Sequence, residues 1–249
     1  MSDNNQIVCG IHAVELLLKK SVDQVNKLFV QANRQDGKIQ RLIALAKKNS
    51  IPVVKWDVKK LDGMTDDNHQ GIIAEITNSG ARVWSENDLY QMIEDKGSPV
   101  LLLILDGVTD PHNLGACLRT ADAAGVDAVV VPKDNAVGLN STVRKVACGA
   151  AETVPFFAVT NLVRALKSLQ DLGVWIIGTA GEAEQNIYQA KFTGPMGLVM
   201  GAEGKGMRRL TRENCDELIK IPMAGDVSSL NVSVAAGVCL FEIVRQKSL

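Results

Sequence analysis

The sequence predicts an α/β protein built on a mostly parallel sheet. Short apolar runs of strand length alternate with stretches of helical periodicity along most of the 249 residues. This alternation is typical of a parallel sheet that lies between layers of helices. Apolar residues make up 46% of the chain, which is ample for a buried core. Glycine and polar residues directly follow several apolar runs, where ligands bind in such sheets.

The first 77 residues are expected to form a compact module of strands and helices. Residues 11–18 and 39–48 have helical periodicity. Residues 27–30, 51–54 and 71–76 are short apolar runs and predict strands. The polar and acidic segment 78–99 contains Gly80, Gly97 and Pro99. We therefore expect a linker there, with one or two helical turns near 88–94.

Residues 100–249 predict a second α/β unit. Its expected strands are 100–105, 128–131, 174–177, 198–200 and 218–221, and its expected helices are 114–124, 161–172 and 232–245. The carboxyl ends of parallel strands meet at one edge of a sheet. Four segments should therefore converge on one rim, namely 106–113, 178–181, 201–206 and 222–231.

Charge is unevenly distributed along the chain. Residues 1–60 hold eleven Lys and Arg against five Asp and Glu, a net charge of +6. Residues 61–98 hold two against eight, a net charge of −6. A basic N-terminal third suits contact with phosphate, although an ordinary lysine-rich surface explains it equally well.

Composition also excludes several classes of protein. No apolar run is long enough to span a bilayer and the N-terminus does not resemble a signal peptide, so we expect a cytoplasmic protein without membrane contact. The five cysteines are scattered and none forms a CxxC pair, which argues against disulfides or zinc. Cys117, Cys148 and Cys239 have small apolar neighbours, so buried packing is their expected role. The three histidines lack metal-ligand spacing, and we expect no metal site.

Two residues that follow the strand 101–105 are candidates for chemistry. Asn113 stands where the N-cap of the next helix is expected. Arg119 lies six positions on, among small apolar neighbours, and a buried arginine needs a partner. That partner is either an acid such as Asp122 or Glu203, in a salt bridge, or a substrate phosphate or developing oxyanion.

The loop 201–206 has the sequence Gly-Ala-Glu-Gly-Lys-Gly and directly follows a predicted strand. It is not a P-loop, and the chain has no Gly-x-Gly-x-x-Gly at the start of a helix. Glu203 is expected either to cap the next helix or to orient Arg119. Further on, Ser228, Ser229 and Asn231 precede a helix of small residues, whose free N–H groups suit a polar or anionic ligand group.

Three segments together resemble the signature motifs of the SpoU (TrmH) branch of the SPOUT RNA methyltransferases. They are residues 113–121, 198–206 and 221–233, and their order and spacing match as well. Residues 10–14 and 69–72 are similar to the substrate-binding domain of the same branch. The resemblance therefore covers nearly the whole chain.

The resemblance implies an S-adenosylmethionine-dependent enzyme that methylates a guanosine ribose 2′-oxygen in 23S rRNA, in the peptidyl-transferase region. It implies an RNA-binding domain like ribosomal protein L30e at 1–77, a linker at 78–99, and a SPOUT domain with a deep trefoil knot at 100–249. Family members are homodimers. The partner would be 23S rRNA or a large-subunit assembly intermediate.

The resemblance also implies roles for individual residues. Arg119 would act on the ribose hydroxyl, and we favour stabilisation of the developing alkoxide, because an arginine that stays protonated is a poor base. The residues expected to hold Arg119 and the ribose are Asn113, Glu203, Ser229 and Asn231. Those expected to bind the cofactor are Thr179, Gly201, Ile221 and Leu230.

Three alternatives remain open at this point. The same chemistry can act on tRNA or on another rRNA site, because related enzymes with these motifs modify tRNA. A non-catalytic RNA-binding or ribosome-assembly factor would have no evident need for Arg119, Glu203 and Asn231 together. A small-molecule enzyme with a nucleotide cofactor would need a phosphate loop and would leave the basic N-terminal module unexplained.

Overall fold

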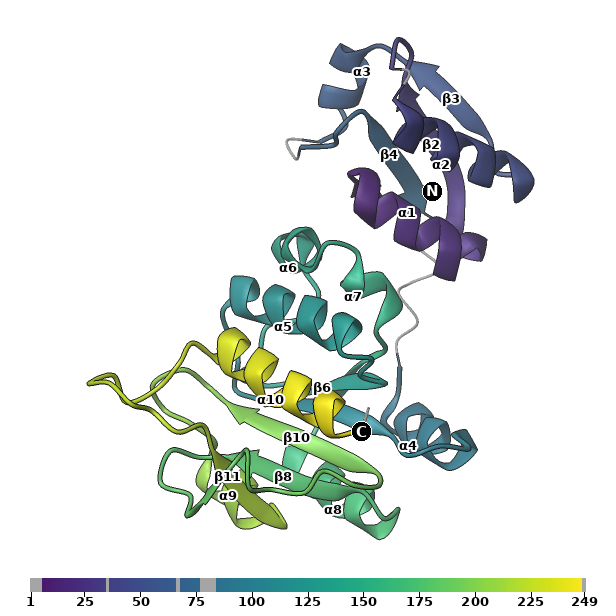
Figure 1. Cartoon of the computed structure of the whole chain (residues 1–249). Helices are drawn as coiled ribbons and strands as arrows, with labels where there is room; N and C mark the ends of the chain where they lie inside the picture. Colours follow the sequence, from purple (N-terminus) through teal and green to yellow (C-terminus); the bar gives the residue numbers. More distant parts are fainter. Residues whose placement is uncertain (1–5, 35, 66–67, 77–83, 248–249) are drawn as a thin grey trace. The chain divides into compact units, whose positions relative to one another are not determined.

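The computed structural model describes residues 6–34, 36–65, 68–76 and 84–247 (Figure 1). The chain divides into two compact units, Met1–Val83 and Trp84–Leu249. Each unit has hydrophobic clusters of its own. In the part of the chain that is described, no helix is long and apolar enough to cross a membrane.

The first unit contains a four-stranded sheet in the order β1-β4-β2-β3. Strand β4 pairs antiparallel with β1 and β2, whereas β2 and β3 are parallel. Residues of the first two helices pack on one face of the sheet, and α3 contributes Leu61 to the other. The elements are β1 Gln6–Cys9, α1 Ile11–Lys20, the 3-10 helix Val22–Gln24, β2 Val25–Gln31, α2 Gly37–Lys48, β3 Val53–Trp56, α3 Val58–Asp62 and β4 Ile72–Ile76.

The two N-terminal motifs meet in this unit. The Gln70 side chain accepts a hydrogen bond from the backbone N–H of Ile11, at the start of α1, with an N···O distance of 3.0 Å. His69 is buried, and its Nδ1 accepts from the Gly71 backbone while its Nε2 contacts Asp62. The turn at residues 69–71 is thus held against the start of α1 by side-chain hydrogen bonds.

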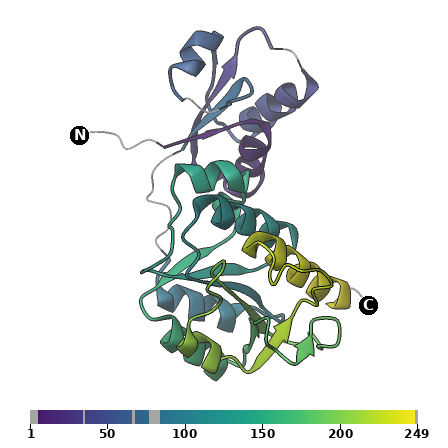
Figure 2. The same ribbon diagram turned by 90° about the vertical axis from the view of Figure 1, so that its left-hand side faces the viewer.

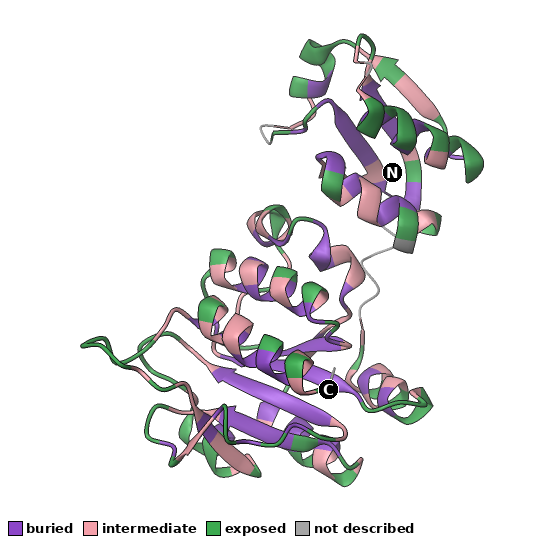
Figure 3. Cartoon of the chain, viewed as in Figure 1, coloured by how far each residue is buried: buried purple, intermediate pink, exposed green. Residues whose placement is uncertain are grey.

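The second unit is built on a seven-stranded sheet in the order β7-β6-β5-β10-β8-β11-β9. Its ladders are parallel, as the alternating pattern predicts. Its central strands are buried (Figure 3). The strands are β5 Leu101–Asp106, β6 Ala128–Pro132, β7 Phe156–Val159, β8 Trp175–Thr179, β9 Gln185–Asn186, β10 Met196–Gly201 and β11 Glu217–Lys220.

Helices cover both faces of this sheet. Helix α5 (Pro111–Ala123) packs beside α10 (Val232–Lys247) on one face, and Figure 2 shows the pair from a second direction. The short helices α6 (Ser141–Ala147) and α7 (Ala150–Thr153) pack against α5. Helices α4 (Glu86–Asp95) and α8 (Leu162–Asp171) pack on the other face. Helix α9 (Arg209–Glu213) contacts α8.

Two details differ from the sequence-based expectation. Residues 78–99 were expected to be a linker, but their described part, 84–99, belongs to the second unit. Helix α4 in this segment buries Leu89 and Ile93, and a capping box at Ser85 starts it. Helix α5 begins at Pro111, and the Asp110 side chain caps it by accepting from His112 N. Asn113 is therefore not the N-cap, because proline suits the first position of a helix and moves the start one turn back.

Candidate active site

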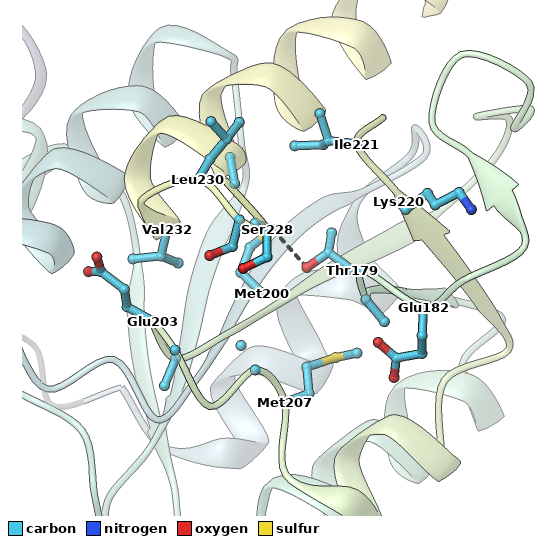
Figure 4. A pocket seen from close by; sticks show the side chains of 18 of the residues that line it. Thr179, Glu182, Met200, Glu203, Met207, Lys220, Ile221, Ser228, Leu230 and Val232 are labelled. Carbon is cyan, nitrogen blue, oxygen red and sulfur yellow. Dashed lines mark hydrogen bonds between the residues drawn. The ribbon is translucent and has the colours of Figure 1, made fainter. Parts of the chain in front are cut away.

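A cavity of about 670 Å³ lies beyond the carboxyl ends of β8, β10 and β11 (Figure 4). Its position agrees with the general place of ligands in parallel sheets. The rim segments predicted at 178–181, 201–206 and 222–231 all contribute to its lining. The lining is made of residues 179–182, 200–207, 212, 219–223, 228–230, 232 and 235.

The four residues expected to bind a cofactor all line this one cavity. Thr179 ends β8, and its hydroxyl donates to the backbone oxygen of Val199 over 3.1 Å. Gly201 ends β10, and Ile221 follows β11. Leu230 stands just before α10 (Figure 4). Segments that lie up to 51 positions apart in the sequence therefore supply the walls.

Charged side chains line another part of the cavity. Glu182 and Arg212 form an ion pair, and Lys220 lies on the same side in Figure 4. Hydrogen bonds from its own backbone N–H and from Arg212 lower the pKa of Glu182 below its ordinary value. The carboxylate is therefore ionised at neutral pH. The sequence analysis did not single out these three residues.

A polar network joins three of the predicted catalytic residues. The Asn231 side-chain amide donates to Asn113 Oδ1 over 2.9 Å and to Glu203 Oε2 over 3.3 Å. The amide of Asn113 also donates to Glu203 Oε2, over 3.3 Å. Asn231 Oδ1 in turn accepts from the backbone N–H of Ser233 in the first turn of α10. Three distant segments thus meet at one carboxylate.

Arg119 lies two turns along α5 and differs from the expectation, because its side chain is exposed rather than buried. Its Nη1 donates to the Sγ of Cys148 over 3.6 Å. Asp122 accepts from Thr153 Oγ1, and Glu203 accepts from the two asparagines. An exposed guanidinium is accessible to a substrate.

Ser229 lines the cavity together with Ser228, and both are exposed. Ser229 thus lines the same cavity as the four cofactor candidates, and Glu203 lines this cavity as well. In the described ranges, no group of three or more His, Cys, Asp or Glu side chains is arranged to hold a metal ion.

The three cysteines expected to be buried differ in their exposure. Cys117 and Cys239 are buried as expected, and burial raises the pKa of each thiol to about 12. Cys148 is exposed, which contradicts the expectation of buried packing. It ends α6 in a left-handed conformation with φ 52°, followed by Gly149. The chain turns there, and the small neighbours that suggested burial belong to two different helices.

Comparison with known proteins adds to this geometry. The model of the SpoU rRNA Methylase family matches residues 100–241. The chain belongs to this family. The model for RNA 2′-O ribose methyltransferase substrate binding matches residues 7–80. The SpoU rRNA methylase match contains the cavity and the polar network, so both lie within the family's catalytic region.

Relatives of nearly the same length support the assignment to the SpoU rRNA methylase family. A protein of Pseudomonas aeruginosa named 23S rRNA (guanosine-2′-O-)-methyltransferase RlmB is 58% identical over 241 residues, 97% of this chain and 96% of that protein. The protein of the same name from Escherichia coli K12 is 55% identical over 98% of this chain and 100% of its own length. A crystal structure of an RNA 2′-O ribose methyltransferase, 25% identical, matches with a TM-score of 0.79 over 100% of this chain and 91% of that chain.

Proposed function

We propose that this chain transfers a methyl group from S-adenosylmethionine to the ribose 2′-oxygen of a guanosine in the peptidyl-transferase region of 23S rRNA. The observation that carries the proposal is the near full-length identity of 55–58% to enzymes named for that reaction. The cavity and the polar network at its edge lie in the part that matches the methylase family. The substrate is 23S rRNA or a large-subunit assembly intermediate.

The cavity suits S-adenosylmethionine in size and chemistry. Ligand pockets commonly measure about 300–1,000 Å³ and combine apolar walls with a few polar groups. Ile221, Leu230 and Val232 offer apolar surface for a purine ring, while the ion pair of Glu182 and Arg212 offers charge for a zwitterionic tail. Thr179, Gly201, Ile221 and Leu230 are the residues we assign to the cofactor. When bound, S-adenosylmethionine supplies a methyl group activated by its sulfonium.

The protein's task is then to align the ribose hydroxyl and to accommodate the charge that develops on its oxygen. The guanidinium of Arg119 has N–H donors and no acceptor, so it donates hydrogen bonds to the ribose oxygen and does not take the proton. That proton leaves to solvent water as the new carbon–oxygen bond forms and the carbon–sulfur bond breaks. The exposed guanidinium of Arg119 stabilises the developing alkoxide, the kind of interaction that contributes most when it strengthens in the transition state. The ribose is positioned beside this guanidinium by Asn113, Glu203, Ser229 and Asn231. Such positioning uses binding energy to orient the reacting groups.

The first unit serves as the RNA-binding domain in this proposal. It matches the substrate-binding family model, and the stretch 1–60 carries a net charge of +6. We place its end at residue 77, propose that it resembles ribosomal protein L30e, and assign residues 100–249 to the methyltransferase domain. Helix α4, from the segment expected to be a linker, packs with that domain.

The proposal includes a deep trefoil knot, a homodimer and a cytoplasmic location. Support for the knot comes from the match of residues 100–241 to the SpoU family. Support for the dimer comes from α10, where Val234 and Phe241 are each at least half exposed. They stand seven positions apart and so lie on one side of the helix. A location in the cytoplasm follows from the substrate.

The experiment is methyl transfer from labelled S-adenosylmethionine to large-subunit rRNA that lacks its own modifications, with the labelled nucleotide mapped. Label in one ribose 2′-O-methylguanosine of 23S rRNA is the expected result. Label in tRNA alone would retain the chemistry and reject the ribosomal substrate. Absence of transfer to naked rRNA with transfer to an assembly intermediate would identify the intermediate as the substrate. Absence of cofactor binding would reject the enzyme.

A further inference from the structure

Asp106 is a buried carboxylate that the proposed reaction has not yet used. It ends β5 at the rim of the sheet, and only 1% of the residue is exposed. Its two oxygens accept from one residue, 102 positions away: Oδ2 from the backbone N–H of Arg208 over 2.8 Å, and Oδ1 from the Arg208 Nε over 2.6 Å. Removing the Asp106 carboxylate from water costs free energy that an apolar side chain at the same place would not, so a charge here calls for another explanation.

Arg208 follows the glycine loop of residues 201–207, which we call the Glu203 loop. Asp106 lies opposite Gly201 in the pairing of β5 with β10, so its carboxylate stands where the loop leaves the sheet. The same carboxylate binds Arg208, where the loop returns. Asp106 therefore adjoins both ends of the Glu203 loop, through strand pairing where the loop leaves the sheet and through its carboxylate where the loop returns.

The Glu203 loop is closed on itself between these ends. Ala202 and Gly206 exchange backbone hydrogen bonds of 3.1 and 2.8 Å. A Cβ on Gly201 would lie 2.2 Å from the carbonyl carbon of Gly206, so only glycine lets the returning chain pass there. These bonds close the loop near its base, and the contact with Asp106 fixes the residue at which the loop returns.

The loop carries two parts of the proposed site. Glu203, near its tip, accepts from Asn113 and Asn231 and so joins α5 to α10. The backbone of residues 201–206 lines the cavity. A displacement of the loop would therefore shift the carboxylate at the centre of the network and the wall of the cofactor cavity together.

We infer that Asp106 is a positioning residue for methyl transfer: through Arg208 its carboxylate holds the Glu203 loop, and with it Glu203 and the cavity wall. The inference rests on the proposed function. The Arg208 side chain is 49% exposed, so it adds little apolar packing. Its Nε donates to Asp106.

The first test is Asp106→Asn in the full-length protein, measured by the Kd for S-adenosylmethionine, by kcat and KM on rRNA, and by Tm. We expect kcat to fall about 10- to 100-fold, because a displacement of about 1 Å in a reacting geometry has effects of that size. The cofactor Kd should rise as well. The matched control is Asp127→Asn, at the other end of β5, where Asp127 accepts from Leu101 N over 2.7 Å. That variant should lower Tm and leave kcat and Kd within about twofold.

The second test separates positioning from a general loss of stability. If Asp106 acts through the Glu203 loop, the double variant of Asp106→Asn with Glu203→Gln should lose no more kcat than Glu203→Gln alone, since coupled residues are not additive. Effects that multiply independently would overturn the inference. So would an Asp106→Asn protein with a lower Tm but unchanged kcat and Kd.

A third variant keeps the question decidable if Asp106→Asn does not fold. Arg208→Ala retains the backbone N–H that Asp106 accepts and removes only the Nε contact. We expect it to raise the Kd and lower kcat in the same direction, by a smaller factor. An Arg208→Ala protein with wild-type constants would overturn the inference. Inactivity of the wild-type protein on every RNA would instead reject the proposed function, so the two failures are distinguishable.

Discussion

Arg119 presents an exposed guanidinium whose Nη1 donates to the thiol of Cys148. We predict that Arg119→Lys keeps the charge but loses the planar fork, and lowers kcat about 10²- to 10³-fold, the usual effect of removing one oxyanion donor. Arg119 is not among the described residues that line the cavity, so the Kd for S-adenosylmethionine should stay within about twofold. Single-turnover methyl transfer and equilibrium binding measure the two quantities. Wild-type turnover in Arg119→Lys would reject the role given to the fork.

Cys148 adopts φ 52°, a left-handed conformation that is unfavourable for any residue with a Cβ. We predict that Cys148→Gly raises Tm by about 1–3 °C, because relief of this conformation outweighs the extra freedom of the unfolded chain. It should also lower kcat about 2- to 10-fold, because Arg119 loses its sulfur partner. Thermal melting and steady-state kinetics test both effects.

Two other variants serve as controls for Cys148→Gly. Cys148→Asn tolerates the left-handed conformation and offers an amide oxygen, so it should retain turnover. Ser50 has a similar left-handed conformation, φ 59°, in the first unit. Ser50→Gly removes the Cβ that makes this conformation unfavourable and should leave turnover unchanged. A Cys148→Gly protein with unchanged kcat would show that the thiol contact does not matter to Arg119.

Residue types and the ends of the predicted strands indicated that distant segments would converge on one rim. Asn113, Glu203 and Asn231 come from three separate motifs, and the structure joins them through side-chain hydrogen bonds. The exposure of Arg119 and its contact with Cys148 were not predictable. They depend on how α6 and α5 pack, a contact between elements that local sequence does not encode.

At the scale of elements, helix starts show where local rules compete. Asn113 is a good N-cap by type, but Asp110 followed by Pro111 is a stronger start signal one turn earlier. Because Asp110 takes the capping role, the Oδ1 of Asn113 is available to accept from Asn231, while the amide N–H of Asn113 donates to Glu203. The Asp110-Pro111 start signal was present in the sequence, but local rules also allowed Asn113 as the N-cap. Only the structure shows which of the two residues caps the helix.

Helix α10 is tied to the segment between β9 and β10 by Gln246. Its side chain donates to the Ala190 backbone over 3.1 Å and to Glu242 Oε1 over 2.8 Å, and accepts from Phe192 N over 3.1 Å. Hydrogen bonds from Arg245 and Gln246 lower the pKa of Glu242 from 4.5 to about 2. A carboxylate so stabilised contributes stability above its unfolded pKa of 4.5, and the contribution is lost as pH falls towards 2.

We therefore predict that Glu242→Gln has a lower Tm than wild type at pH 7, and that the difference shrinks as pH falls from 4.5 towards 2. Thermal unfolding at several pH values across this range measures it. Glu213→Gln is the matched control, because Glu213 forms an exposed pair with Arg209 and should change Tm by no more than about 2 °C. A difference that persists unchanged at pH 2 would contradict the role of the ionised carboxylate.

At the scale of the whole molecule, alternation of apolar runs and helical segments predicted the parallel sheet and the separate first module. Several short elements were not predicted, each of two to seven residues: β1, α3, α6, α7, β7 and β9. Elements this short have too few residues for a periodicity to be recognised. The order of the strands in the sheet was equally inaccessible, because periodicity describes single elements and not their arrangement.

The boundary between the units is where the whole-molecule interpretation is most open to test. The sequence suggests that the second domain begins at residue 100, whereas the compact unit begins at Trp84 and includes α4. That helix buries Leu89 completely and Ile93 to all but 8% of its surface. Full burial of such a side chain is worth about 1.5–3 kcal/mol. A fragment of residues 100–249 would therefore expose a substantial apolar area.

We predict that the fragment 84–249 folds and binds S-adenosylmethionine with a Kd within about twofold of the full chain, because the cavity lies wholly within it. Its kcat/KM on rRNA should fall at least about tenfold, since it lacks the stretch with a net charge of +6 and the phosphate contacts that such charge provides. The fragment 100–249 should melt about 10 °C lower than 84–249, because it lacks α4. Calorimetry and methyl-transfer kinetics on the three proteins distinguish these outcomes. If 84–249 methylates rRNA as efficiently as the full chain, then the first unit does not bind the substrate, and the basic charge of its surface is only an ordinary solvated exterior.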